Sequence, residues 1–368
     1  MSSIVKEVLS RSAQETAAQP MTRAAGVSTE DEELERILAG LRTNIKILGA
    51  GGGGCNTIER LVESGIVGAE LYALNTDAQH LLMKHAPHKV LLGRRSTRGL
   101  GAGALPQVGE QAAKEAEDEI RAIVQGADIV FITCGLGGGT GTGAAPLIAM
   151  LAKEAGALTI AICTFPFKAE GVVRAENAEY GLERLRAVVD TVIVIPNDKL
   201  LEIVPRLSIQ NAFKVADEVL VRSIRGLTEV ITKPGLVNLD FNDLKTIMKG
   251  GGVAMIGIGE GEDDTRAEDA VNEAINSPLI EVDISGATGA LIDVQGGSDM
   301  TVSEAEKVAE IIQSKISPNA RIIWGAAIDP DLENRLRVMA VITGVRSKQI
   351  LGKAEAAKGK EIGIDLIR

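Results

Sequence analysis

Short, nearly continuous apolar runs alternate with amphipathic stretches along most of the chain. Such runs are typical of strands buried on both faces of a sheet, and the stretches between them have helical spacing. Strand and helix therefore alternate, which predicts a parallel α/β sheet covered by helices on both faces. The runs behind this prediction are NIKILGA, AELYALNTD, ADIVFITC, LTIAICTFPF and TVIVIPND.

A much longer amphipathic stretch follows this series. From Ile209 to Ile231 apolar residues recur with helical spacing, which predicts a helix of about 24 residues and about 36 Å that ends before Pro234. A helix as long as a domain is wide usually packs against two domains, and the apolar runs after it predict a smaller α/β domain. We therefore expect an N-terminal extension with an amphipathic helix (1–43), a parallel-sheet domain (44–205), the central helix (206–234), the smaller domain (235–351) and a flexible tail (352–368).

Composition argues against several classes of function. The 368 residues carry 39 Lys+Arg against 50 Asp+Glu, a net charge of −11, and aromatic residues make up 2% of the chain. Neither phosphate-backbone binding by bulk charge nor base stacking on aromatic rings is expected, so we predict no nucleic-acid partner. No apolar run reaches the roughly 20 residues of a membrane span. The N-terminus has no signal-peptide pattern, and the three cysteines have no zinc or redox spacing. A cytoplasmic protein without membrane insertion is expected.

The placement of glycine points to a binding site. Three glycine-rich segments, at 49–54, 99–103 and 137–143, each follow a predicted strand. The carboxyl ends of parallel strands share one edge of a sheet, so the three segments should converge there. Backbone amides left open by glycine at helix N-termini bind phosphates. One such segment could be tight packing alone, but three together predict a polyphosphate site.

Two kinds of nucleotide remain open on this pattern. Gly49, Gly51 and Gly54 fit the fingerprint G-x-G-x-x-G, with Asp77 about twenty residues later, so a dinucleotide-binding oxidoreductase is one interpretation. No residue pattern downstream supplies hydride-transfer chemistry, however. The chain also lacks the motif G-x-x-x-x-G-K-[ST], so glycine amides rather than a lysine would hold the phosphates.

The run GGGTGTG at 137–143 resembles the signature of the tubulin/FtsZ superfamily of GTPases. Other segments occur in the family's order: GGGGCN, NTD at 75–77, TFPF followed by Glu170 and Arg174, IPND, NAFKVADEVL and NLDFNDL. The resemblance extends from about residue 44 to residue 351 and is to the FtsZ branch, in its archaeal form, rather than to tubulin. It implies a fold in which a long central helix joins a parallel-sheet GTP-binding domain to a smaller α/β domain, with GTP or GDP and Mg²⁺ as ligands.

The resemblance also implies roles for individual residues. Glu170 and Arg174 would hold the ribose, Asn197 and Asp217 would read guanine, and Phe213 would lie against the base. A carboxylate suits guanine, whose N1–H and 2-amino donors are adjacent. The other interpretation of Phe213 is a plain core residue of the long helix. The phosphates and one side of the base would contact Gly51, Gly52, Gly53, Gly54, Cys55, Asn56, Gly138, Gly139, Thr140, Gly141 and Thr142.

The candidate water-activating residues lie outside the glycine segments. In NLDFNDL, Asp240 and Asp243 stand three residues apart at a predicted helix start, where they could simply cap the helix. The resemblance implies that both aspartates orient or deprotonate the attacking water, and that Asn238 contacts the γ-phosphate region, in the next subunit of a filament. The two roles are compatible. The protein ligand of the metal stays unknown.

The resemblance implies that the protein forms a head-to-tail homopolymer, which builds the division ring at midcell. It also implies that assembly activates GTP hydrolysis. The terminal GIDLI at 363–367 resembles the short tail by which this family recruits membrane adaptors such as SepF, and a disordered stub is the other interpretation. A filament protein that binds GTP without hydrolysing it is a further alternative, which the two aspartates disfavour.

Overall fold

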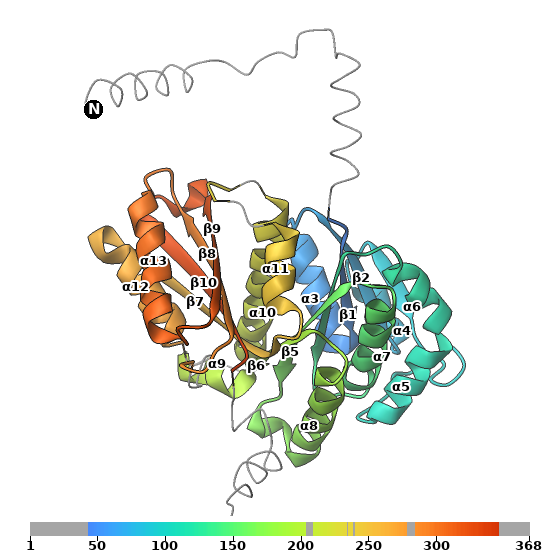
Figure 1. The fold of residues 1–368 in the computed structure, drawn as a ribbon. Coiled ribbons are helices and arrows are strands. Elements are labelled where there is room, and N and C mark those ends of the chain that lie inside the picture. The colour runs from blue at the N-terminus through green and yellow to red at the C-terminus, as the bar shows by residue number, and fades with distance from the viewer. Residues whose placement is uncertain (1–42, 204–208, 234, 238–239, 278–283, 346–368) are drawn as a thin grey trace, which may run out of the picture. The chain divides into compact units, whose positions relative to one another are not determined.

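The computed structural model describes residues 43–203, 209–233, 235–237, 240–277 and 284–345 (Figure 1). The strands formed by these residues make one ten-stranded sheet in the order β3-β2-β1-β4-β5-β6-β7-β10-β8-β9. The strands are β1 (Ile45–Ala50), β2 (Ala69–Asn75), β3 (His88–Leu91), β4 (Ile129–Gly135), β5 (Leu158–Phe165), β6 (Thr191–Pro196), β7 (Gly252–Glu262), β8 (Gly289–Gly296), β9 (Arg321–Ile328) and β10 (Arg335–Thr343).

The first six strands are all parallel, as the alternating pattern predicts. β1 lies between β2 and β4, so the chain order reverses on either side of it. In an open parallel sheet, ligands bind beyond the carboxyl ends of the strands at such a reversal. The topology therefore places the ends of β1 and β4, with the glycine segments that follow them, at the expected binding edge.

The last four strands form a mixed arrangement rather than a parallel one. β10 runs antiparallel to both β7 and β8, whereas β8 and β9 are parallel. β7 also pairs with the end of β6 through Thr191–Gly252, Val192–Val253 and Ile193–Ala254. The smaller α/β half thus continues the sheet of the first half, a connection that local periodicity does not contain.

The long central helix is α10 (Ile209–Thr232), of 24 residues. Its Ile224 and Leu227 are fully buried, in a core cluster that also holds Ile58 from the first half and Met339 from the second. A Cβ on Gly226 would lie 2.7 Å from Sδ of Met339, so the glycine lets the helix approach β10 closely. α10 therefore packs against both halves of the chain, as its length predicts.

Ten further α-helices are among the described elements: α3 (Gly51–Glu63), α4 (Ala78–Met83), α5 (Pro106–Glu115), α6 (Glu117–Val124), α7 (Thr140–Glu154), α8 (Val172–Arg186), α9 (Asn197–Ile203), α11 (Phe241–Met248), α12 (Arg266–Ile275) and α13 (Val302–Lys315). The glycines at 51–54 and 141–143 are the first turns of α3 and α7 rather than loops before them. No helix within the described ranges is both long and apolar enough to cross a bilayer. The predicted N-terminal helix and C-terminal tail lie outside the described residues.

Candidate functional site

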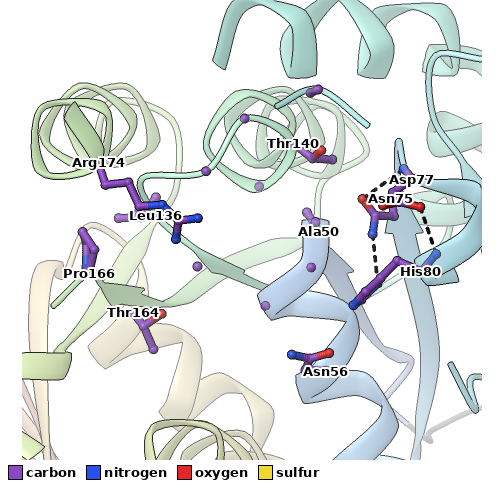
Figure 2. A pocket seen from close by; sticks show the side chains of 18 of the residues that line it. Ala50, Asn56, Asn75, Asp77, His80, Leu136, Thr140, Thr164, Pro166 and Arg174 are labelled. Atoms are coloured by element: carbon purple, nitrogen blue, oxygen red, sulfur yellow. Dashed lines mark hydrogen bonds between the residues drawn. The ribbon is translucent and has the colours of Figure 1, made fainter. Parts of the chain in front are cut away.

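A cavity of about 520 Å³ lies at the carboxyl ends of β1 and β4 (Figure 2). All three glycine segments reach it, so the convergence predicted from the sequence is present. The predicted residues that line it are Gly51, Gly52, Gly53, Asn56, Gly138, Gly139, Thr140, Gly141, Glu170, Arg174, Asn197, Phe213 and Asp217.

Two helix N-termini open into this cavity. α3 follows Ala50 and α7 follows Gly139, and neither cap residue supplies a side-chain hydrogen bond to the first turn. Neither first turn contains an acidic residue. The first amides of a helix have no partner within the helix and carry partial positive charge. This end of the cavity is therefore suited to phosphate oxygens.

The glycines differ in what they do. A Cβ at Gly51 (φ +74°) would lie 2.7 Å from the amide nitrogen of Gly141, so this glycine allows the two helix starts to touch. A Cβ at Gly139 would lie 2.4 Å from the carbonyl oxygen of Gly103, and the amide of Gly139 donates to that oxygen at 3.0 Å. Gly52 and Gly138 instead face open space. Packing explains the first pair, whereas backbone access for a ligand explains the second.

Two buried side-chain oxygens at the cavity have no hydrogen-bond partner. Asn197, at the start of α9, is 4% exposed, and its Oδ1 has no hydrogen-bond partner. Oδ1 of Asn56, in α3, is likewise buried without a partner. Of the three buried side-chain atoms in the described chain that lack a partner, two thus belong to this cavity. Leaving such atoms unpaired costs about 1–3 kcal/mol each, which a bound polar ligand would relieve.

A carboxylate and an aromatic ring stand together on α10. Asp217 lines the cavity, and burial raises the pKa of its carboxyl while Arg60 and Lys84 oppose the rise. Phe213, one turn earlier, is 40% exposed and meets Phe167 edge to face, with ring centroids 5.1 Å apart. This exposure does not fit the interpretation of Phe213 as a plain core residue. Its position suits a flat ligand group instead.

Glu170 and Arg174 form an ion pair at the edge of the cavity. Nη1 of Arg174 lies 2.5 Å from Oε2 of Glu170, whose other oxygen accepts the amide of Phe167 at 2.9 Å. Figure 2 shows the Arg174 side chain extending from α8 toward Leu136. The two predicted residues therefore occur together, with the carboxylate holding the arginine.

Three of the residues predicted to bind the nucleotide do not line the cavity. The side chain of Cys55 is fully buried, with its Sγ 3.6 Å from the carbonyl oxygen of Leu74, and burial raises the pKa of the thiol to about 12. Gly54 faces the strands, since a Cβ there would lie 2.5 Å from the carbonyl oxygen of Thr133. Thr142 supports the third segment, because its Oγ1 accepts the amide of Gly137 at 2.9 Å.

The NTD motif contributes a wall that no predicted role covered. Asn75, Thr76, Asp77 and His80 all line the cavity. Oγ1 of Thr76 lies 2.6 Å from Oγ1 of Thr140, while Asp77 caps α4 by accepting the amide of His80 at 2.9 Å. Asp77 is the acidic residue that the dinucleotide fingerprint would use for a ribose, and here its carboxylate caps a helix. The motif at the end of β2 was the signal that could have identified this wall.

The acidic pair lies elsewhere. Asp240 caps α11, and its Oδ1 accepts the amide of Asp243 at 2.9 Å, so the capping interpretation is correct. Neither residue lines the cavity. α10 lies between them and the cavity along the chain, and from Asp217 to Thr232 it extends roughly 22 Å at 1.5 Å per residue. Asn238 lies outside the described residues.

Comparisons with known proteins agree with this architecture. The family described as "Tubulin/FtsZ family, GTPase domain" matches residues 44–205, and "FtsZ family, C-terminal domain" matches residues 252–346. The chain is similar to Cell division protein FtsZ 1 of Archaeoglobus fulgidus, with 58% identity over the full length of both chains. Cell division protein FtsZ 1 of Pyrococcus furiosus is 54% identical to this chain, over 96% of this chain and 95% of that protein.

One solved structure gives the same result in three dimensions. It is titled "FtsZ dimer, empty (M. jannaschii)" and superposes with a TM-score of 0.82 at 56% identity. The superposition covers 86% of this chain and 93% of that one. The similarity therefore includes both halves of the sheet and the central helix between them.

Proposed function

The chain belongs to the tubulin/FtsZ family, and from this premise we propose that it is a GTP-hydrolysing cytoskeletal protein that polymerises head-to-tail in cell division. The observation that carries the proposal is the cavity, which is lined both by two uncapped helix N-termini and by the buried Asn197 and the half-buried Asp217. One side suits a chain of phosphates, and the other suits a base with adjacent donors. We therefore expect the protein to bind GTP and, as a member of this family, to act in the cytoplasm at the division site.

The cavity residues would divide the nucleotide among them. The amides at 51–53 and 138–141 would hold the phosphates, and Glu170 with Arg174 would hold the ribose edge. Asp217 would accept N1–H and the 2-amino group of guanine, Asn197 would pair with the base edge, and Phe213 would cover its face. Adenine offers no matching pair of donors, so guanine is the expected base.

Mg²⁺ is the expected companion of the triphosphate. Within the described residues no group of three or more His, Cys, Asp or Glu could hold a metal ion. Mg²⁺ commonly keeps several waters and takes phosphate oxygens as ligands. The ion would therefore enter with the nucleotide and neutralise part of its charge, while the glycine amides hold the phosphates in place.

Hydrolysis would need a second subunit. The cavity contains no side chain placed as an obvious water activator, and the exposed Asp240 and its neighbour Asp243 lie beyond the C-terminal end of α10, at the start of α11. We infer that these aspartates, with Asn238, enter the cavity of the next subunit and orient or deprotonate the attacking water. Capping fixes where Asp240 points, so its structural role serves the catalytic one.

Exposed apolar side chains support a head-to-tail contact. Leu100, within the second glycine segment, is 86% exposed, and Val172, two residues after Glu170, is 73% exposed. Near the acidic pair, Leu236 is 60% exposed. Exposed apolar side chains next to functional groups often mark contact surfaces. A contact between unlike ends is heterologous and does not close, so it produces filaments.

GTP turnover per subunit as a function of protein concentration tests the shared site. We expect turnover to rise steeply with concentration and Asp243→Ala to keep GTP binding and assembly while losing hydrolysis. Asp264→Ala, which removes an exposed aspartate from the turn before α12, is the matched control and should retain turnover. Constant turnover per subunit down to high dilution would refute the shared site, and assembly with GTP but without phosphate release would favour the purely structural alternative.

The adaptor proposal concerns the end of the chain. Residues 352–368 lie outside the described residues, and they contain the segment GIDLI at 363–367. We propose that this tail recruits a membrane adaptor such as SepF. Deletion of residues 363–368 should abolish binding to the adaptor and leave GTP turnover unchanged, and adaptor binding by the truncated chain would contradict the proposal.

A further inference from the structure

Arg60, on α3, forms an ion pair with Asp217, the residue proposed to bind the guanine base. Its Nε lies 3.3 Å from Oδ2 of Asp217, and their side chains are only 30% and 17% exposed. Arg60 does not itself line the nucleotide cavity. It lines a second cavity, of about 500 Å³, between α3, α10 and strands β7, β8 and β10. The arginine therefore links the Asp217 carboxylate to helix α3 without entering the cavity in which the base would lie.

A carboxylate that accepts hydrogen bonds from both N1–H and the 2-amino group of guanine has to lie with its two oxygens in the plane of the base. It can accept about four hydrogen bonds, so Arg60 can bind Oδ2 while N1–H and the 2-amino group take the remaining lone pairs. Without a partner, the carboxylate would be free to rotate about its last side-chain bond. Among the described residues, Arg60 is the only group that forms an ion pair with Asp217.

We propose that Arg60 is a positioning residue that holds Asp217 in the orientation needed to recognise guanine, and so sets the purine specificity of the site. The inference rests on the proposed function, in which Asp217 accepts the guanine donors. It concerns a residue outside the cavity, on the helix whose N-terminus would hold the phosphates. α3 would therefore contribute to both ends of the nucleotide, through its first amides and through Arg60.

Charge is the second contribution of Arg60. Burial raises the pKa of the Asp217 carboxyl, and Arg60 is the strongest group that lowers it again, followed by Lys84. Lys84 is itself paired with Glu59, Nζ to Oε2 at 2.8 Å, so its charge is shared. Other ionisable groups at the same cavity are Asp77, His80, Glu170 and Arg174. Removing Arg60 should therefore make Asp217 easier to protonate and less able to accept two donors.

Nucleotide competition on the full-length chain tests the inference, at concentrations below those that support assembly. The probes are GTP and inosine triphosphate, which lacks the 2-amino group, against a fluorescent GTP analogue. For Arg60→Met we expect GTP affinity to fall roughly three- to tenfold and inosine triphosphate affinity to fall less, so that the preference for GTP narrows. GTP affinity of this variant should also begin to decrease at a higher pH on acidification than that of the wild type.

Arg222→Met is the matched control. Arg222 lies on α10, lines the same second cavity and pairs with Glu218 and Glu260, but it does not contact Asp217. This variant should keep the wild-type preference for GTP. Arg60→Lys, which retains the charge, should recover part of the preference and most of the pH profile.

The outcomes distinguish a failure of the role of Arg60 from a failure of the proposed GTP-binding function. If Arg60→Met weakens both nucleotides equally and leaves the pH profile unchanged, Arg60 only supports the fold and the inference is wrong. In an Asp217→Asn background, Arg60→Met should have no further effect on the preference, and an undiminished effect there would also overturn it. If the wild type shows no preference for GTP over ATP, the proposed function itself fails.

Discussion

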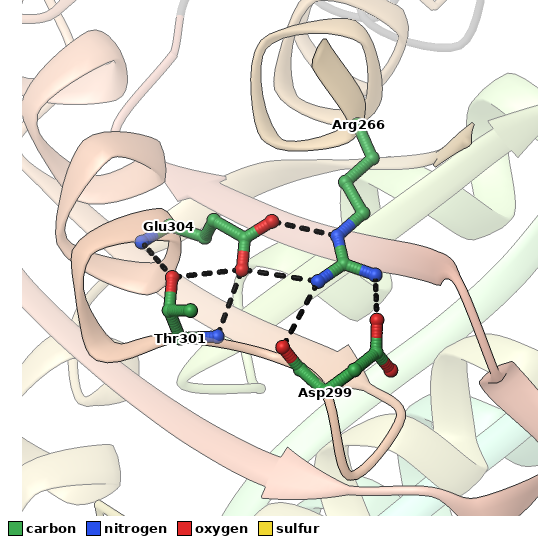
Figure 3. Close-up of polar contacts among 4 residues, drawn as sticks. All are labelled: Arg266, Asp299, Thr301 and Glu304. Carbon is green, nitrogen blue, oxygen red and sulfur yellow. Dashed lines mark hydrogen bonds and ion pairs between the residues drawn. The ribbon is translucent and has the colours of Figure 1, made fainter. Parts of the chain in front are cut away.

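The ion cluster around Arg266 is expected to contribute about 2 kcal/mol to stability. Arg266 begins α12 and is 7% exposed (Figure 3). Its Nε donates to Oε1 of Glu304 at 2.6 Å, its Nη2 to Oε2 of the same carboxylate at 3.1 Å, and its Nη1 to the carboxylate of Asp299. Glu304 also closes the capping box of α13 with Thr301. The arginine thus joins α12 to the cap of α13.

The magnitude follows from the lowered pKa of Glu304. Hydrogen bonding to Arg266 is the largest cause that lowers the pKa of Glu304, from 4.5 to about 2. A shift of this size corresponds to roughly 3.4 kcal/mol at about 1.4 kcal/mol per pKa unit. Thr301 supplies part of the shift and water screens the rim of the pair, so we assign about 2 kcal/mol to the arginine. Because the folded pKa is lowered, this stability is present above about pH 4.5 and is lost as the pH falls toward 2.

Urea unfolding of Arg266→Met, Glu304→Gln and the double variant measures this coupling. At pH 7 the double-mutant cycle should give an interaction free energy of about 2 kcal/mol, and the coupling should shrink as the pH approaches 3. Lys307→Met is the matched control, since Lys307 pairs with Glu268 across the same two helices but both side chains are about half exposed. It should cost less than about 0.5 kcal/mol. Additive effects of Arg266→Met and Glu304→Gln at pH 7 would refute the reasoning.

Three further predictions concern the binding cavity, helix packing and a buried acid. Asn197→Ala should weaken GTP binding roughly tenfold. It should leave the melting temperature of the nucleotide-free protein unchanged or higher, because it removes an unpaired buried oxygen, and a lower melting temperature would contradict this. Gly143→Ala should cost at least about 2 kcal/mol in urea unfolding, since its Cβ would lie 2.0 Å from the carbonyl oxygen of Pro106, whereas Gly286→Ala, which faces open space, should cost little; equal costs would refute the packing argument. Burial raises the pKa of Asp293 to about 7, so ionisation costs stability as the pH rises from about 4 through 7, and Asp293→Asn should be the more stable protein at pH 8 by at least about 1 kcal/mol, with no such gain expected near pH 4.

Much of the fold could be predicted from local pattern. Strands such as 129–135 are almost fully buried and read as continuous apolar runs, and the spacing from Ile209 to Ile231 gave the long helix its correct length. The antiparallel placement of β10 between β7 and β8 could not be predicted in this way. An apolar run has the same pattern whether the strand pairs in parallel or antiparallel. The direction and the partner are decided by packing between segments that are distant in the sequence.

The site was predictable as a set of segments but not as a set of side chains. Cys55 follows four glycines, and the resemblance to the family predicts that it contacts the ligand. However, α3 begins at Gly51, so residues 54, 55 and 58 are buried toward the sheet while residues 52, 53 and 56 face the cavity. Successive residues of a helix point in different directions, so a contiguous run cannot all contact one ligand. The position of the helix start, which depends on how closely Gly51 packs against Gly141, decided which side chains face inward.

The sequence alone determined that this protein has parallel strands, converging glycine segments, a central helix and an acidic pair beyond it, because each of these is a local pattern of residue types. Only the tertiary structure decided that Asn75, Thr76 and His80 complete the cavity, that Arg60 reaches Asp217 from another helix, and that Asp240 stays out of its own cavity. These relations join segments far apart in the chain. They depend on sheet order, helix phase and the length of α10, which are set when the whole core packs at once.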